Sequence, residues 1–180
     1  MENISNSKTE SPAPTVLFHA SRNRGITLFE PRAEKYRDPL EGPVVFATPD
    51  KAYASCFLVP TDDSWVKIGR YSNDGIHGPW NAVISNEGRF KQADSGGVIY
   101  HLPIQSFAFH PERNMGNIEW TSTLPVKPVD KELYESGLSA MRKAGVNVYF
   151  VDWAIFDAIK QSNDHGKSII DSLSPDYRTQ

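Results

Sequence analysis

The chain has one cysteine, Cys56, among its 180 residues. A single thiol cannot form a disulfide within the chain, nor build the cysteine-rich cluster of many structural zinc sites. Long apolar runs are missing as well, since no stretch approaches the roughly 18 consecutive apolar residues of a membrane-spanning helix. These absences predict a soluble, intracellular protein.

The chain also lacks a strong excess of charge, because 19 basic residues face 22 acidic ones and the net charge is −3. This balance argues against a chain built mainly to coat nucleic acid or an acidic membrane. The polar stretch 1–14 contains no apolar segment of the kind found in a secretory signal. We therefore expect a cytoplasmic protein, or one delivered into a host or target cell by a route without such a signal.

Several familiar catalytic motifs are missing. The chain contains no G-x-G-x-x-G and no G-x-S-x-G sequence, which are typical of dinucleotide-binding domains and of serine hydrolases. His165-Gly166-Lys167-Ser168 resembles the end of a phosphate-binding loop, but Gln161 stands where that loop requires a glycine. The five histidines show no H-x-x-x-H or H-x-H spacing, so we expect no bound metal.

Hydrophobic residues make up 39% of the chain, which is enough for one sizeable core. A length of 180 residues is too short for two such cores. We expect one domain over 15–173, with polar tails at 1–14 and 174–180. Short apolar runs separated by turn residues predict strands, and capped periodic segments predict helices. The expected strands are 15–19, 44–47, 65–71, 80–85, 97–102, 107–110, 118–124 and 146–151, and the expected helices are 48–59, 130–143 and a short one within 153–159.

This order of elements does not alternate regularly between strand and helix, so it favours an α+β fold over a doubly wound parallel sheet. We expect two facing β-sheets with a cleft between them. Three segments carry residues suited to chemistry. They are Leu17-Phe18-His19-Ala20-Ser21, then Val44-Val45-Phe46-Ala47-Thr48 leading into a helix with Tyr53 and Ser55, and finally Asn117-Ile118-Glu119-Trp120.

In their order and context, these segments resemble the ADP-ribosyltransferase superfamily, in particular its diphtheria-toxin and poly(ADP-ribose) polymerase branch. That branch carries a His-Gly-Ser/Thr element on its first strand, a Phe-Ala element before a helix with Ser and Tyr, and a late Glu. The resemblance covers roughly residues 15–125. It implies split β-sheets, an NAD cleft, and transfer of ADP-ribose from NAD with release of nicotinamide.

The resemblance assigns a role to each matching residue. His19 would hydrogen-bond a ribose hydroxyl, the backbone of Ala20 would hold the nicotinamide amide, and Glu119 would be the catalytic carboxylate. Ala20 stands where the family has glycine. The remaining cofactor-binding candidates are Ser21, Phe46, Ala47, Tyr53 and Ser55, with Tyr53 or Phe46 as the aromatic wall. A gapped alignment puts Ser55 at the family's stacking tyrosine, two positions after Tyr53.

Bond cleavage between nicotinamide and ribose develops positive charge on the ribose, and a nearby carboxylate stabilises that charge. This chemistry needs no metal. The expected acceptor is a macromolecule, protein rather than nucleic acid, as in a toxin or effector. Arginine-directed toxins have glutamate at the position of Asn117, so the sequence disfavours an arginine target.

Two alternatives stay open. The same fold can serve as a non-catalytic nucleotide- or protein-binding module, or as an enzyme similar to RNA 2′-phosphotransferases. Each candidate residue also has a purely structural interpretation. Histidine can end a strand, glutamate can face solvent, Ser21 can stabilise a turn, and aromatic residues can be core.

Overall fold

The computed structural model describes residues 14–33, 42–73, 76–110 and 118–175. The expected tail at 1–14 lies almost wholly outside these residues, as does Asn117. The strands are β1 (Val16–Ser21), β2 (Val45–Ala47), β3 (Val66–Gly69), β4 (Ser72–Asn73), β5 (Ile76–His77), β6 (Asn81–Ile84), β7 (Gly97–Pro103), β8 (Ala108–Phe109), β9 (Trp120–Ser122), β10 (Asp130–Tyr134) and β11 (Asn147–Phe150).

Five α-helices accompany these strands in the described part of the chain: α1 (Lys51–Ser55), α2 (Glu87–Ala93), α3 (Gly137–Lys143), α4 (Trp153–Gln161) and α5 (Lys167–Ser172). Within the same residues, short 3-10 helices cover Cys56–Leu58 and Ile104–Ser106. The first of them continues α1, which confirms the expectation of helical structure after Ala47. None of the described helices is both long and apolar enough to cross a membrane.

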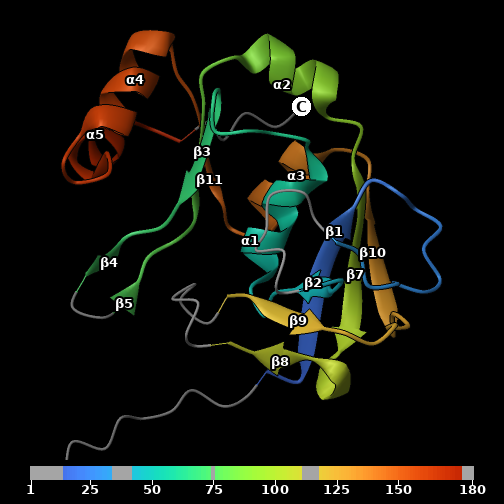
Figure 1. Cartoon of the computed structure of the whole chain (residues 1–180). Helices are drawn as coiled ribbons and strands as arrows, with labels where there is room; N and C mark the ends of the chain where they lie inside the picture. Colours follow the sequence, from blue (N-terminus) through green and yellow to red (C-terminus); the bar gives the residue numbers. More distant parts are fainter. Residues whose placement is uncertain (1–13, 34–41, 74–75, 111–117, 176–180) are drawn as a thin grey trace, which may run out of the picture.

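The strands form three small three-stranded sheets and one two-stranded ribbon (Figure 1). Their orders are β1-β7-β10, β11-β6-β3 and β2-β9-β8, with β4 paired to β5. All named pairs are antiparallel except β11 with β6, which is parallel. The fold is therefore mixed α and β with segregated small sheets, as the order of elements predicted.

Helix α3 lies between two of the sheets. Leu138 and Met141 pack into the core formed with β6 and β11, whereas Ala140 packs against Ile99 of β7 and Tyr134 of β10. Figure 1 likewise shows α1 and α3 in the middle of the molecule, beside β1, β7 and β10. In the described residues this position is filled by helices, so an open cleft between two facing sheets is not observed there.

The expected helix over 130–143 is wrong in its first half. Asp130–Tyr134 is strand β10, paired with β7, and only Gly137–Lys143 is helical. Asp94 explains where α3 begins, because its carboxylate accepts hydrogen bonds from the Ser136 hydroxyl and from the first two backbone N–H groups of the helix. The apolar spacing from Leu133 onward imitated one continuous helix across this break.

Two helices were not expected at all. Asn86 caps α2 by accepting a hydrogen bond from the Arg89 backbone N–H, although Asn86-Glu87-Gly88 resembles a turn. Helix α5 follows Gly166, which adopts a left-handed conformation with φ of 89°. A third correction concerns α1, which begins at Lys51 with Asp50 as its N-cap and so starts later than the expected helix over 48–59.

Candidate functional site

The edge of β1 that faces away from β7 is the first feature of the candidate site. The backbone N–H and C=O of Phe18 both pair with Thr48, at 2.7 and 3.0 Å, on the side of β1 away from β7. Backbone groups of alternate residues in a strand point to the same side. Those of Ala20 therefore also point away from β7, just beyond the place where the chain turns from Thr48 into α1. Among the described residues, no backbone group of a loop or helix forms a hydrogen bond with the backbone of Ala20 on this side.

His19 is held by β2. Its Nδ1 lies 2.7 Å from the backbone oxygen of Phe46, and its ring packs against Phe29 at a centroid distance of 4.6 Å. A carbonyl oxygen can only accept a hydrogen bond, so Nδ1 carries the proton. In the neutral ring Nε2 is then the acceptor, which suits a ligand hydroxyl.

Glu119 reaches the same neighbourhood through β9. Strand β9 pairs antiparallel with β2, with Trp120 opposite Ala47. Thr48 directly follows Ala47, and Glu119 directly precedes Trp120. Glu119 therefore lies beside the junction of β1, β2 and α1. Its side chain is half-buried. The first strand and the late carboxylate, about 100 residues apart in sequence, are thus joined through β2.

Trp120 fixes the start of β9 by packing. Its ring lies 5.6 Å from that of Phe109 and packs onto the core around Leu17 and Tyr100. In the described part of the chain, its indole N–H is the one buried side-chain polar atom without a hydrogen-bond partner. Trp120 therefore acts here as an apolar neighbour of Glu119.

Tyr53 lies on α1 close enough to Glu119 to be influenced by its charge. Burial raises the pKa of Tyr53, and the negative charge of Glu119 raises it further. The ring is tilted over Trp80 at a centroid distance of 4.6 Å, and Phe57 meets it edge-on at 4.9 Å. Neighbouring aromatic rings thus hold Tyr53 in place near the candidate catalytic carboxylate.

Asp50 fastens α1 to this aromatic group. One carboxylate oxygen accepts the Tyr53 backbone N–H at 3.1 Å, which caps the helix. The other accepts the Trp80 indole N–H at 2.6 Å and the Arg70 guanidinium at 3.2 Å. Arg70 also lies over the Trp80 ring, 4.8 Å from its centroid. This network orients the helix that carries Tyr53.

A second polar cluster ties α1 to β10. The Glu132 carboxylate accepts hydrogen bonds from Lys51 at 2.5 and 2.6 Å, from the Tyr134 hydroxyl at 2.7 Å and from His101 Nε2 at 2.8 Å. Burial alone would raise the pKa of Glu132, but these hydrogen bonds lower it to about 2. Glu132 is therefore ionised in the folded protein at neutral pH and holds all three partners.

Sequence reasoning missed the residues of these two networks. The Thr-Pro-Asp sequence before α1 offered one signal, because aspartate is a favoured N-cap. Nothing in the sequence indicated the bond from Asp50 to Trp80, which lies 30 positions further along the chain. The pairing of Lys51 with Glu132 depends on β10 being a strand, which the sequence did not predict.

The other candidate residues have mostly structural surroundings. Ser21 accepts a hydrogen bond from the Asn23 backbone N–H, as a turn residue does. Ser55 is fully buried and its hydroxyl donates to the Ala52 carbonyl, so no ligand could reach it without a rearrangement of α1. Ala47 is buried, and Phe46 supplies the carbonyl that holds His19.

The described residues contain no group of three or more His, Cys, Asp or Glu side chains arranged to hold a metal ion. The arrangement at the end of β1 instead offers a strand edge at Ala20 that faces away from β7, an imidazole acceptor at His19, and a half-buried carboxylate at Glu119. Comparisons of the chain with protein-family models, with curated proteins and with solved structures found no match.

Proposed function

We propose that this chain is an ADP-ribosyltransferase that cleaves NAD, releases nicotinamide and transfers ADP-ribose to a macromolecule. The observation that carries the proposal is the strand edge at Ala20, next to His19 and to the junction with β9. A backbone N–H and C=O side by side can pair with the C=O and NH₂ of a primary carboxamide. Nicotinamide carries such a group.

His19 would accept a hydrogen bond from a ribose hydroxyl through Nε2. The bond from Nδ1 to Phe46 supports this role, because it fixes both the tautomer and the orientation of the ring. NAD would therefore bind along the end of β1 and bend around His19.

Glu119 would act on the ribose as the bond to nicotinamide breaks. Its carboxylate would stabilise the positive charge that develops there, and a half-buried charge acts more strongly than one in water. The leaving nicotinamide takes the bonding electron pair, and the acceptor nucleophile, or water, forms the new bond to the ribose carbon. Tyr53 would border the site next to Glu119.

The direct test is incubation of the protein with NAD labelled in its adenine half, with and without a cell lysate. The proposal predicts release of nicotinamide and transfer of label to a lysate protein. Release without transfer would indicate a glycohydrolase. If NAD binds in calorimetry but no nicotinamide is released with any lysate, the chain is a binding module and the proposal fails.

A further inference from the structure

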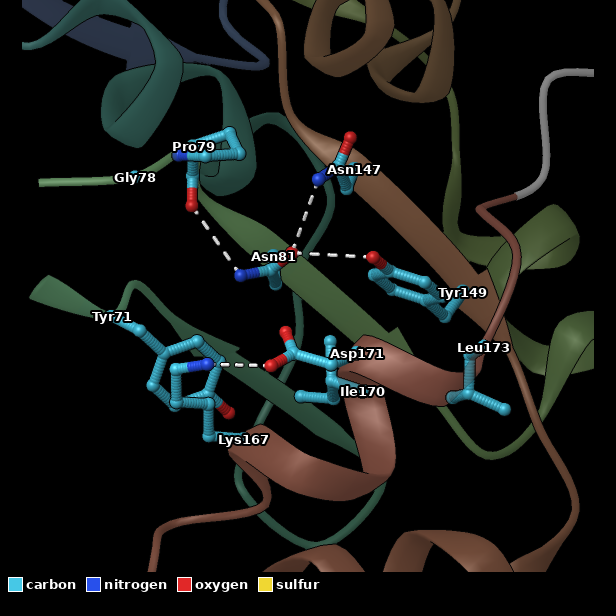
Figure 2. Close-up of a pocket in the computed structure, with 10 residues that line it drawn as sticks. All are labelled: Tyr71, Gly78, Pro79, Asn81, Asn147, Tyr149, Lys167, Ile170, Asp171 and Leu173. Atoms are coloured by element: carbon cyan, nitrogen blue, oxygen red, sulfur yellow. Dashed lines mark hydrogen bonds and ion pairs between the residues drawn. The ribbon is translucent and has the colours of Figure 1, made fainter. Parts of the chain in front are cut away.

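A separate pocket lies where the parallel strands β6 and β11 begin, and helix α5 forms one of its walls (Figure 2). Its volume is about 290 Å³. The polar side chains that line it are Tyr71, Asn81, Asn147, Tyr149, Lys167 and Asp171. This volume is near the lower end of ligand pockets, so the pocket suits a ligand with a single ring.

Asn81 is a buried polar residue of this pocket. It is 6% exposed and stands opposite Asn147 in the register of the two strands. Its Oδ1 accepts hydrogen bonds from Asn147 Nδ2 at 3.3 Å and from the Tyr149 hydroxyl at 3.5 Å, and its Nδ2 donates to the Pro79 carbonyl at 3.3 Å. One N–H of Asn81 has no further partner among the described residues.

Two charged side chains of α5 stand on the opposite wall. Lys167 and Asp171 form an ion pair at 2.5 Å, and Figure 2 shows the Asp171 carboxylate directed across the pocket toward Asn81. Their charges cancel, so the pocket has no net charge. The pair still offers further N–H donors on Lys167 and a second acceptor oxygen on Asp171.

Aromatic surface completes the pocket. Tyr71 donates its hydroxyl hydrogen bond to the His165 carbonyl at 2.9 Å, which fixes its ring in the pocket wall. Ile170 and Leu173 add apolar contacts from the segment that begins with α5. The pocket thus combines apolar walls with a few polar groups, as small-molecule sites do.

From this geometry we propose that the pocket binds a neutral polyhydroxylated ring, a pentose or a hexose. Each hydroxyl both donates and accepts a hydrogen bond. Adjacent hydroxyls can therefore accept from Lys167 and Asn81 while donating to Asp171, and the ion pair stays balanced. Because the ion pair leaves the pocket without net charge, neither an anion nor a cation gains a net electrostatic attraction there. This site is independent of the proposed NAD chemistry.

Saturation-transfer NMR on the full chain tests the proposal, with ribose, glucose and adenosine as neutral probes at millimolar concentrations. Ribose 5-phosphate and glucosamine are the charged probes, and adenine is the probe without a sugar. We expect saturation transfer to at least one neutral sugar. Transfer to adenosine as well as ribose would identify a nucleoside sugar as the source, and transfer to glucose a free hexose.

Two variants place the binding in the pocket. Asp171→Asn removes the acceptor charge at an exposed helix position and should weaken sugar binding about tenfold or more. Asp157→Asn on α4 changes the same residue type at an exposed position outside the pocket and should leave binding unchanged. Three results would overturn the proposal: no transfer to any neutral sugar, stronger transfer to a charged probe or adenine, or equal binding by wild type and Asp171→Asn.

Discussion

The Nδ1 atom of His19 lies 2.7 Å from the backbone oxygen of Phe46 and joins strand β1 to strand β2. Phe18 of β1 is also bridged to Thr48, the residue directly after β2. One side of the imidazole is thereby committed to the fold, and Nε2 is the ring nitrogen that the proposed contact with a ribose hydroxyl would use. A structural role and a binding role are compatible in this residue, because they use different ring nitrogens.

His19→Asn separates these two roles. The asparagine N–H can replace Nδ1 in the bond to Phe46, but it supplies no equivalent of Nε2. We expect the dissociation constant for NAD to rise about tenfold, since one hydrogen bond to the ligand is lost. The midpoint of denaturant unfolding should stay near that of wild type. Isothermal titration measures the first quantity, and unchanged NAD affinity in this variant would exclude Nε2 from the binding site.

Asp50→Ala should destabilise the protein by about 2–3 kcal/mol, because it removes a helix cap and also leaves the Trp80 indole N–H and Arg70 without their acceptor. Asp152 is a matched control, since its side chain caps α4 at the Ile155 backbone N–H and has no other partner in the described residues. Asp152→Ala should cost about 1 kcal/mol. If urea unfolding shows the same loss of unfolding free energy for both variants, the contacts of Asp50 with Trp80 and Arg70 add nothing to stability.

The pKa of Glu132, about 2 against an ordinary value of 4.5, makes part of the stability depend on pH. A carboxyl group whose pKa is lowered by folding stabilises the folded state above its unfolded pKa, and this contribution disappears as the pH falls through its folded pKa. We expect Glu132→Gln to cost about 1–2 kcal/mol at neutral pH, after allowance for solvent screening of a side chain that is 28% exposed.

This cost should shrink as the pH is lowered from 4.5 toward 2. Glu135→Gln provides the comparison, because the Glu135 side chain is 82% exposed and lies 3.7 Å from Arg24. Its effect on the free energy of unfolding should be small throughout. A cost for Glu132→Gln that does not change with pH would contradict the hydrogen-bonded cluster around this carboxylate.

Cys56 should be chemically inert in the folded protein. Burial raises the pKa of its thiol to about 12, and the side chain is fully buried. Because the thiolate is the reactive form, iodoacetamide at about pH 8 should not modify the native protein and should modify one thiol after denaturation. Mass spectrometry measures the labelling. Fast modification of the native state would show that Cys56 is accessible to solvent.

Short apolar strands and the helix after Ala47 could be predicted because local sequence determines them. β-branched and aromatic runs bounded by turn residues favour strands, and Asp50 lies in a sequence that favours the start of a helix. For the same reason the order of β1, which carries His19, and β9, which directly follows Glu119, was predictable. Their joint attachment to β2 depends on pairing between distant strands.

The error at 130–143 shows where local pattern is insufficient. Leu133, Tyr134 and Leu138 have helical spacing, but Tyr134 pairs with Gly97 of β7 and Leu133 is 58% exposed. Pairing with β7 and the bonds of Glu132 to Lys51 and His101 outweigh the helical preference of this segment. Interactions between residues far apart in sequence decide its conformation, so the periodicity could not reveal it.

Helix α2 illustrates the opposite case, in which a local signal was present and went unused. Asn86 is a favoured N-cap, and Glu87 forms an i,i+4 ion pair with Lys91 at 3.0 Å. The glycine at position 88 made the segment resemble a turn. The capping residue and the charge pair together are a stronger signal for a helix than the glycine is against one.

The most direct test of the proposed chemistry is the rate of nicotinamide release from NAD by wild type and by Glu119→Gln. Because the positive charge on the ribose develops only near the transition state, loss of the carboxylate should lower kcat by about a hundredfold or more and change KM little. Trp120 and β9 should keep their packing, so the unfolding midpoint should be close to that of wild type. Equal kcat values for the two proteins, or no nicotinamide release by wild type, would contradict the proposal that Glu119 catalyses the cleavage of NAD.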